Sequence, residues 1–135
     1  MTDLDIEGAV AALSSWQEET YLWLHQNPEL SMAEKETCDF IDKQLQSFGY
    51  ETQRIGGGVV GVLQNGEGKT TLFRADIDAL PVKEDTGFEY ASTMTRRDAQ
   101  GNEVPVMHAC GHDVHITAGL GAARILSENL SLIHI

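Results

Sequence analysis

A dense group of metal-binding and proton-active residue types lies near the end of the chain. The stretch MHACGHDVH, residues 107–115, holds three of the five histidines and one of the two cysteines of the 135-residue sequence. Gly111 allows a tight turn in which Cys110 and His112 can both face one point. A thiolate and an imidazole are ligands typical of zinc and other late divalent metals. The spacing therefore predicts a metal site where a turn leads into a helix.

Two carboxylates follow a predicted strand earlier in the chain. In TTLFRADID, residues 70–78, Arg74, Asp76 and Asp78 lie at or just past the C-terminal end of a strand that we expect to be central. Ligands bind at that edge of open α/β sheets. Asp76 and Asp78 point the same way in a pleated strand, so they could add oxygen ligands or orient a ligand histidine. Arg74 could instead pair with one of them, and both alternatives remain open.

The residue types alone also allow interpretations without a metal. A single Cys-x-His pair, with no second cysteine pair, is not a closed structural zinc site. His108 and His115 could be ordinary polar residues near a helix start, and Cys38 fits a small buried residue of an amphipathic helix. His25 is interpreted as a helix-end residue rather than a ligand, and His134 is given no role.

Hydrophobic periodicity predicts the helices that position these groups. Apolar residues recur at three- to four-residue steps over residues 5–26, and Asn27-Pro28 ends that helix. SMAE, residues 31–34, has the spacing of a capping box and predicts a second helix that Gly49 ends. A third helix, rich in Ala and Gly, is expected over residues 114–130 and should pack closely against a sheet.

Short β-branched runs bounded by glycines predict the strands. YETQRI and GVVGVLQ, residues 50–55 and 58–64, form one such pair, and NGEG, residues 65–68, is a turn into the strand at 70–78. The polar stretch from Arg96 to Val104 is expected to be a loop or hairpin. The fold class is therefore α/β, with helices packed on a mixed, partly parallel sheet, in one domain spanning residues 1–135.

Composition excludes several classes of partner. The formal net charge is -12, and residues 1–51 contain eleven acidic and two basic side chains. Nucleic acid and anionic membranes are bound mainly through Lys and Arg, so neither is expected as a partner. The sequence has no apolar run that would span a bilayer, and its start lacks the features of a signal peptide, so we expect a cytoplasmic protein.

Three stretches, in this order, carry a family resemblance. HQNPELSMAE, FRADIDALPVKEDTG and MHACGHDVHITAGLGAARIL begin at residues 25, 73 and 107. They resemble the amidohydrolase branch of the co-catalytic metallo-aminoacylase and carboxypeptidase family. That branch includes hippurate hydrolases, auxin-conjugate hydrolases, N-acyl-diaminopimelate deacetylases and N-acyl-amino-acid aminoacylases. The resemblance covers residues 21–126.

This resemblance implies a zinc-peptidase-like catalytic domain that hydrolyses an N-acyl amide bond of a small N-acyl amino acid or related conjugate. Two divalent metal ions, Zn, Mn, Co or Ni, would assist the reaction. Cys110 and His112 fall on the paired metal ligands of the branch, and Asp78 falls on the aspartate that supports catalysis. Asp76 occupies a ligand position where many relatives have histidine.

Asp113, His108 and His115 match the motif without an assigned role, so each is kept as a candidate ligand or supporting residue. The resemblance also implies features that this sequence lacks. Relatives have a catalytic Glu-Glu pair, later histidine ligands, and a second domain that covers the active site and commonly forms a homodimer. We therefore expect an N-terminal part of a longer enzyme, which alone binds metal weakly and is inactive.

The segment from Arg96 to Val104 could shape the substrate entrance, although the sequence leaves the acyl group and amino acid undecided. Two other functions stay open. Cys110 could be the nucleophile of a cysteine hydrolase, activated by His108, His112 or His115. The chain could also be a non-catalytic binding module that pairs with another chain through an exposed sheet edge.

Overall fold

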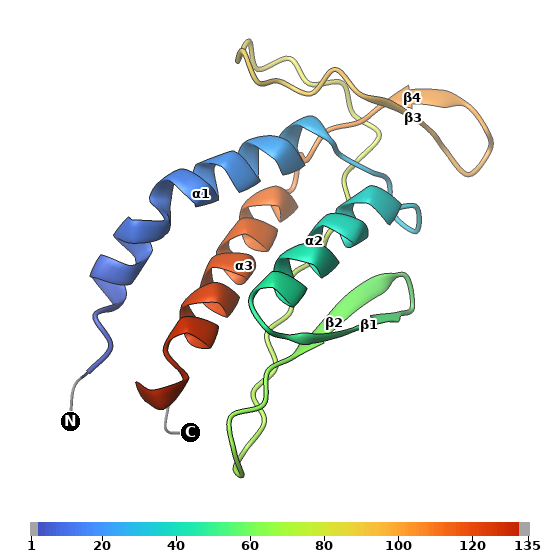
Figure 1. Ribbon diagram of the computed structural model, residues 1–135. Coiled ribbons are helices and arrows are strands. Elements are labelled where there is room, and N and C mark those ends of the chain that lie inside the picture. The colour runs from blue at the N-terminus through green and yellow to red at the C-terminus, as the bar shows by residue number, and fades with distance from the viewer. Residues whose placement is uncertain (1–2, 133–135) are drawn as a thin grey trace.

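The computed structural model describes residues 3–132 as three long helices with two short strand pairs (Figure 1). His134 lies outside the described residues. None of the helices in the described part is both long and apolar enough to cross a membrane. The elements, in chain order, are α1 (Ile6–Gln26), α2 (Lys35–Ser47), β1 (Glu51–Ile55), β2 (Gly58–Val62), β3 (Thr95–Arg97), β4 (Glu103–Pro105), α3 (His112–Glu128) and the 3-10 turn η1 (Leu130–Leu132).

The three helices lie side by side, with α3 between α1 and α2 (Figure 1). Four buried apolar residues form the centre of the core, namely Leu24, Ile41, Ile116 and Leu120. Small residues of α3 permit the close approach: a Cβ at Gly121 would meet the Gln17 side chain of α1 at 2.4 Å. The Ala- and Gly-rich helix thus packs against two helices rather than a sheet surface, and Phe73 of the predicted strand lies against Gly119 of this helix.

The helix boundaries agree with the periodicity, but the start of α2 does not use the predicted capping box. Helix α1 begins with Asp5, whose carboxylate accepts a hydrogen bond from Gly8 N at 2.9 Å. Glu34 takes the N-cap position of α2 and makes no capping bond. The carboxylate of Glu29 accepts bonds from the backbone nitrogens of Glu36 and Thr37 instead. A more distant side chain therefore supplies the cap that Ser31-x-x-Glu34 was expected to form.

Both strand pairs are antiparallel hairpins, as predicted for residues 50–64 and allowed for residues 96–105. Helix α2 packs on the β1–β2 hairpin. The predicted strand at residues 70–78 belongs to neither sheet, because no other strand of the described part lies beside it to complete a ladder. Within residues 3–132, parallel pairing is limited to one isolated bridge, between Leu30 and Ala79. The α/β class is confirmed, while the single mixed sheet is replaced here by two small sheets.

Candidate metal centre

His112 is the first residue of α3 and lies beside Asp78. Gly111 precedes it with a φ of 76°, the left-handed conformation that glycine adopts without strain. The His112 Nδ1 atom lies 2.9 Å from the Asp78 carbonyl oxygen and 3.1 Å from the Asp78 carboxylate. The structure thus joins two of the three residues predicted to share a site, although they are far apart in the sequence.

This contact determines which nitrogen of His112 can bind a metal ion. Both Asp78 oxygens are acceptors, so Nδ1 carries the proton and donates to them. The lone pair of a neutral imidazole then lies on Nε2, which is the form that ligates a metal ion. Asp78 is therefore positioned to orient the His112 ring.

Cys110 lies one glycine before His112 and is exposed as a free thiol. An imidazole nitrogen and a thiol fit a late divalent ion in their chemistry. Across residues 3–132, however, no group of three or more His, Cys, Asp or Glu side chains could hold a metal ion. The described residues therefore do not form a complete set of metal ligands.

Asp76 and His115 take part in local contacts. Arg74 donates to one Asp76 oxygen from Nε at 3.0 Å and from Nη2 at 2.8 Å, and this guanidinium lowers the Asp76 pKa below its ordinary value. The alternative that Arg74 pairs with an aspartate is therefore observed. The exposed ring of His115 stacks on His112, with 6.2 Å between centroids.

His108 is buried without a hydrogen-bond partner at either ring nitrogen. Burial lowers its pKa below the ordinary value, because the charged imidazolium loses its hydration, although the negative charge of Asp113 opposes that shift. The positive charge of the nearby His25 lowers the His108 pKa further. His108 is thus a buried imidazole, 5% exposed, that lies four residues before the start of α3.

A buried network that sequence reasoning missed lies behind the turn. His25, at the end of α1, contacts Asp113 Oδ2 through Nδ1 at 2.7 Å. Its Nε2 atom lies 3.0 Å from both carboxylate oxygens of Glu84. Three segments meet at this histidine, and one of them is the first turn of α3. The interpretation of His25 as only a helix-end residue was therefore incomplete.

Further donors surround the Glu84 carboxylate. Ser92 N donates to it at 2.6 Å and the Thr86 hydroxyl at 2.7 Å. Burial alone would raise the pKa of Glu84, but these bonds and the one from His25 lower it below the ordinary value. Burial likewise opposes charge on His25, yet the bonds that its ring nitrogens donate to Asp113 and Glu84 raise its pKa. The network thus joins a buried imidazole to two buried carboxyl groups.

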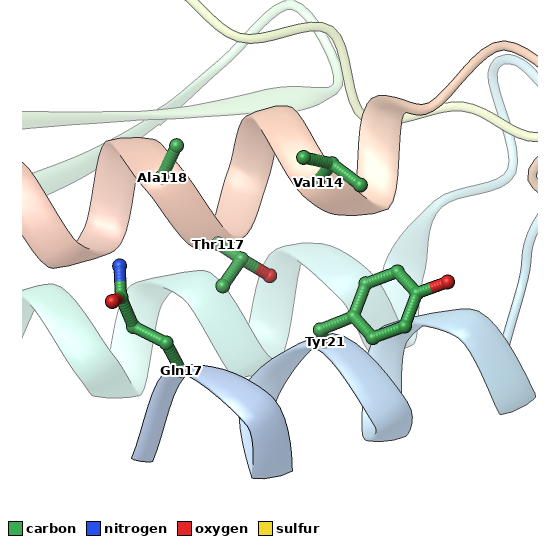
Figure 2. A pocket seen from close by; sticks show the side chains of 5 residues that line it. All are labelled: Gln17, Tyr21, Val114, Thr117 and Ala118. Carbon is green, nitrogen blue, oxygen red and sulfur yellow. The ribbon is translucent and has the colours of Figure 1, made fainter. Parts of the chain in front are cut away.

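An open depression lies between α1 and α3. Its volume is about 320 Å³, and Figure 2 shows Gln17 and Tyr21 from α1 facing Val114, Thr117 and Ala118 from α3. Burial and the nearby Asp113 carboxylate raise the pKa of Tyr21 to about 12. The lining is mainly apolar and holds no proton-transfer group at neutral pH, so the depression is not the candidate reaction site.

Residue types could not have identified the network, because one histidine and one glutamate 59 positions apart carry no spacing signal. Asp113 was kept as a candidate through the motif alone. The available signal was indirect: both HQNPE and VKEDTG lie in the stretches that carry the family resemblance.

Comparisons with known proteins identify the family that this chain resembles. The sequence model of peptidase family M20/M25/M40 matches residues 72–133. The resemblance read from the sequence is confirmed. Among curated proteins, the N-acetyl-L-cysteine deacetylase of Bacillus subtilis is 44% identical over 109 residues, which are 78% of this chain and 24% of the relative. The hippurate hydrolase of Campylobacter jejuni is 43% identical over 108 residues, 78% of this chain and 26% of the relative.

Solved structures give the same result for the fold. An aminohydrolase, described as putative, from methicillin-resistant Staphylococcus aureus matches with a TM-score of 0.80 and 34% identity, over 92% of this chain and 30% of that chain. A Bacillus subtilis protein described as a dinuclear metal binding peptidase from the M20 family matches with a TM-score of 0.74 and 31% identity, over 87% of this chain and 32% of that chain. The chain therefore spans about a quarter to a third of these M20 relatives.

Proposed function

We propose that this chain is the N-terminal part of an M20 amidohydrolase that hydrolyses the N-acyl amide bond of an N-acyl amino acid. The observation that carries the proposal is the contact between His112 Nδ1 and Asp78, at 2.9 Å to its carbonyl and 3.1 Å to its carboxylate. It leaves Nε2 free as a ligand beside a flexible glycine turn. The names of the relatives, deacetylase and hippurate hydrolase, support the substrate class.

In this proposal Cys110 and His112 are metal ligands, and Asp78 fixes the protonation state and direction of the imidazole. Two divalent ions, Zn, Mn, Co or Ni, would supply polarisation of the scissile carbonyl and activation of a water molecule. The dinuclear site named for the Bacillus subtilis relative supports two ions. The remaining ligands and the general base would come from the rest of the catalytic domain, so the chain alone is expected to bind metal weakly and to be inactive.

Further features of the parent enzyme belong to the same proposal. Cys38 and Cys110 are both free thiols, which fits a reducing cytoplasm. A homodimer through a second domain, and a substrate entrance shaped by residues 96–104, follow from the resemblance.

Thiol protection tests the ligand assignment on the chain itself. In a Cys38→Ser variant the single remaining thiol is Cys110, and saturating Co²⁺ is expected to slow its alkylation because the coordinated thiolate is no longer free. The Cys38→Ser, His112→Ala double variant should lose this protection. An alkylation rate that is indifferent to Co²⁺ at any concentration would refute a ligand role for Cys110.

Activity belongs to the full-length parent. It should hydrolyse N-acetyl and N-benzoyl amino acids and lose this activity after chelation, with recovery when metal is returned. A cysteine hydrolase would behave differently: Cys110→Ala would abolish activity with metal content intact, and the wild type would trap an acyl-enzyme. In the described residues no hydrogen bond joins Cys110 to a histidine, so this second function lacks an activating base.

A further inference from the structure

The His25 network brings three nearly fully buried groups from three separate segments to one point. The side chains of His25, Glu84 and Asp113 are exposed by only 8%, 0% and 3%. An ordinary salt bridge holds two charges, but here one imidazole lies between two carboxylates. Because both ring nitrogens face carboxylate oxygens, both donate, and the imidazole is cationic.

Asp113 is also the residue that follows His112 in the chain. Its Oδ2 receives the His25 bond at 2.7 Å, and its Oδ1 accepts from Val114 N at 2.9 Å. The N-cap residue of α3, Gly111, has no side chain that could hold the helix start. The His25 bond to Asp113 therefore holds the start of α3 in place, because the glycine in the turn allows many backbone conformations.

Glu84 sets the orientation of His25 from the opposite side. The Glu84 carboxylate is itself held by Ser92 N and the Thr86 hydroxyl. An imidazole held at Nε2 by such a fixed acceptor must direct its Nδ1 toward Asp113. The contacts thus lead from residues 84–92, through His25 at the end of α1, to Asp113 in the first turn of α3.

We propose that His25, oriented by Glu84, is a positioning residue for the Cys110-Gly111-His112 turn, and that its bond to Asp113 strengthens metal binding by fixing the direction of the ligands. This inference rests on the proposed function, because it takes Cys110 and His112 as ligands. Groups behind the first ligands of a metal commonly change its affinity by roughly 10- to 100-fold.

Two isosteric variants separate positioning from simple stabilisation. The amide nitrogen of His25→Asn reaches the place of Nδ1 and can still donate to Asp113, whereas that of His25→Gln reaches the place of Nε2 and can donate only to Glu84. Both variants lose one buried bond and the positive charge between the two carboxylates, and should melt at lower temperature than the wild type. Only His25→Gln should weaken metal binding, by about tenfold or more.

The measurement is a titration of the 135-residue chain with Co²⁺, followed by the thiolate-to-cobalt charge-transfer absorption of Cys110. Ile41→Val serves as a control, because it lowers stability in the helix core without touching the turn. Its Co²⁺ affinity should equal that of the wild type. Glu84→Gln, which leaves His25 and Asp113 in place, should weaken Co²⁺ binding less than His25→Gln does.

The outcomes distinguish this inference from the proposed function. A wild-type chain that gives no thiolate-to-cobalt band at any concentration would overturn this inference and the ligand role of Cys110 in the chain, whereas the proposed hydrolysis is tested separately by the activity of the full-length parent. A wild-type band combined with equal affinity losses in His25→Asn and His25→Gln, or with losses that follow the melting temperatures of all variants, would overturn the positioning role alone. A selective loss in His25→Gln supports it.

Discussion

The two segments that carry the candidate carboxylates are held in different ways. Asp113 lies in the first turn of α3, 2% exposed, with side-chain contacts to α1. Asp76 lies in a segment that belongs to no sheet, and its neighbours Leu72 and Phe73 are 83% and 68% exposed. Matching a motif therefore says little about whether a side chain is fixed; partners from distant segments decide that.

Asp78 lies between two segments. Residues 70–76, which pair with no strand within residues 3–132, are called the open segment, and the chain from Ala79 onward, which is bonded to distant residues, is called the anchored segment. The next residue, Ala79, donates its backbone N–H to the Glu29 carbonyl at 2.7 Å, and Leu80 pairs with Met107. From this point onward the backbone is bonded to Glu29, in the segment after α1, and to Met107, which immediately precedes His108. Asp78 can therefore orient His112 although the residues before it lack a sheet partner.

The largest expected loss of unfolding free energy is at His25, which contacts Asp113 of the anchored segment. His25→Ala would leave Glu84 and Asp113 as buried carboxylates without their shared cation, and breaking a buried pair in this way costs about 3–5 kcal/mol. Urea unfolding followed by circular dichroism would measure the loss. A change below 1 kcal/mol would mean that water reaches these carboxylates and that the region is not anchored as described.

A smaller loss is expected at Glu29, whose backbone carbonyl accepts the bond from Ala79. Glu29→Ala removes the acceptor of two backbone N–H groups and of the Thr37 hydroxyl, so unfolding should become easier by about 1–3 kcal/mol. Glu34→Ala is the matched control, because Glu34 occupies the N-cap position without a capping bond and should change stability by less than about 0.5 kcal/mol. The reverse order of the two losses would restore the predicted capping box.

The two buried histidines predict opposite pH dependences of stability. The raised pKa of His25 means that its contribution is complete below its unfolded pKa of about 6.5 and is lost as pH rises through the folded value. The lowered pKa of His108 has the opposite sign, so stability is lost as pH falls from about 6.5 toward its folded value. Unfolding free energies measured between pH 5 and 8 should therefore flatten on the alkaline side in His25→Asn and on the acidic side in His108→Gln.

Much of this organisation followed from the sequence, and the rest required long-range contacts. Periodicity predicted the helices because one face of each is buried, and glycines with positive φ, such as Gly49 and Gly111, marked turns. The strand at residues 70–78 was predicted from its β-branched and apolar start, but a ladder needs a partner strand that local pattern cannot supply. The role of His25 depended on Glu84 and Asp113, which no local window contains.

The smallest expected change of unfolding free energy is at Leu72, in the open segment. Leu72 is largely exposed, so Leu72→Ser removes little buried surface and should change the unfolding free energy of the chain by less than about 0.5 kcal/mol. Leu120→Ala is the matched control in the anchored core, where loss of a buried leucine side chain costs about 2–5 kcal/mol. Denaturant titration of both variants gives the contrast directly.

If Leu72→Ser cost as much as Leu120→Ala, residues 70–76 would be packed in solution, and the difference between the two segments would disappear. If it cost almost nothing in this chain but several kcal/mol in the full-length parent, the exposed leucine would be a core residue that the remainder of the catalytic domain covers.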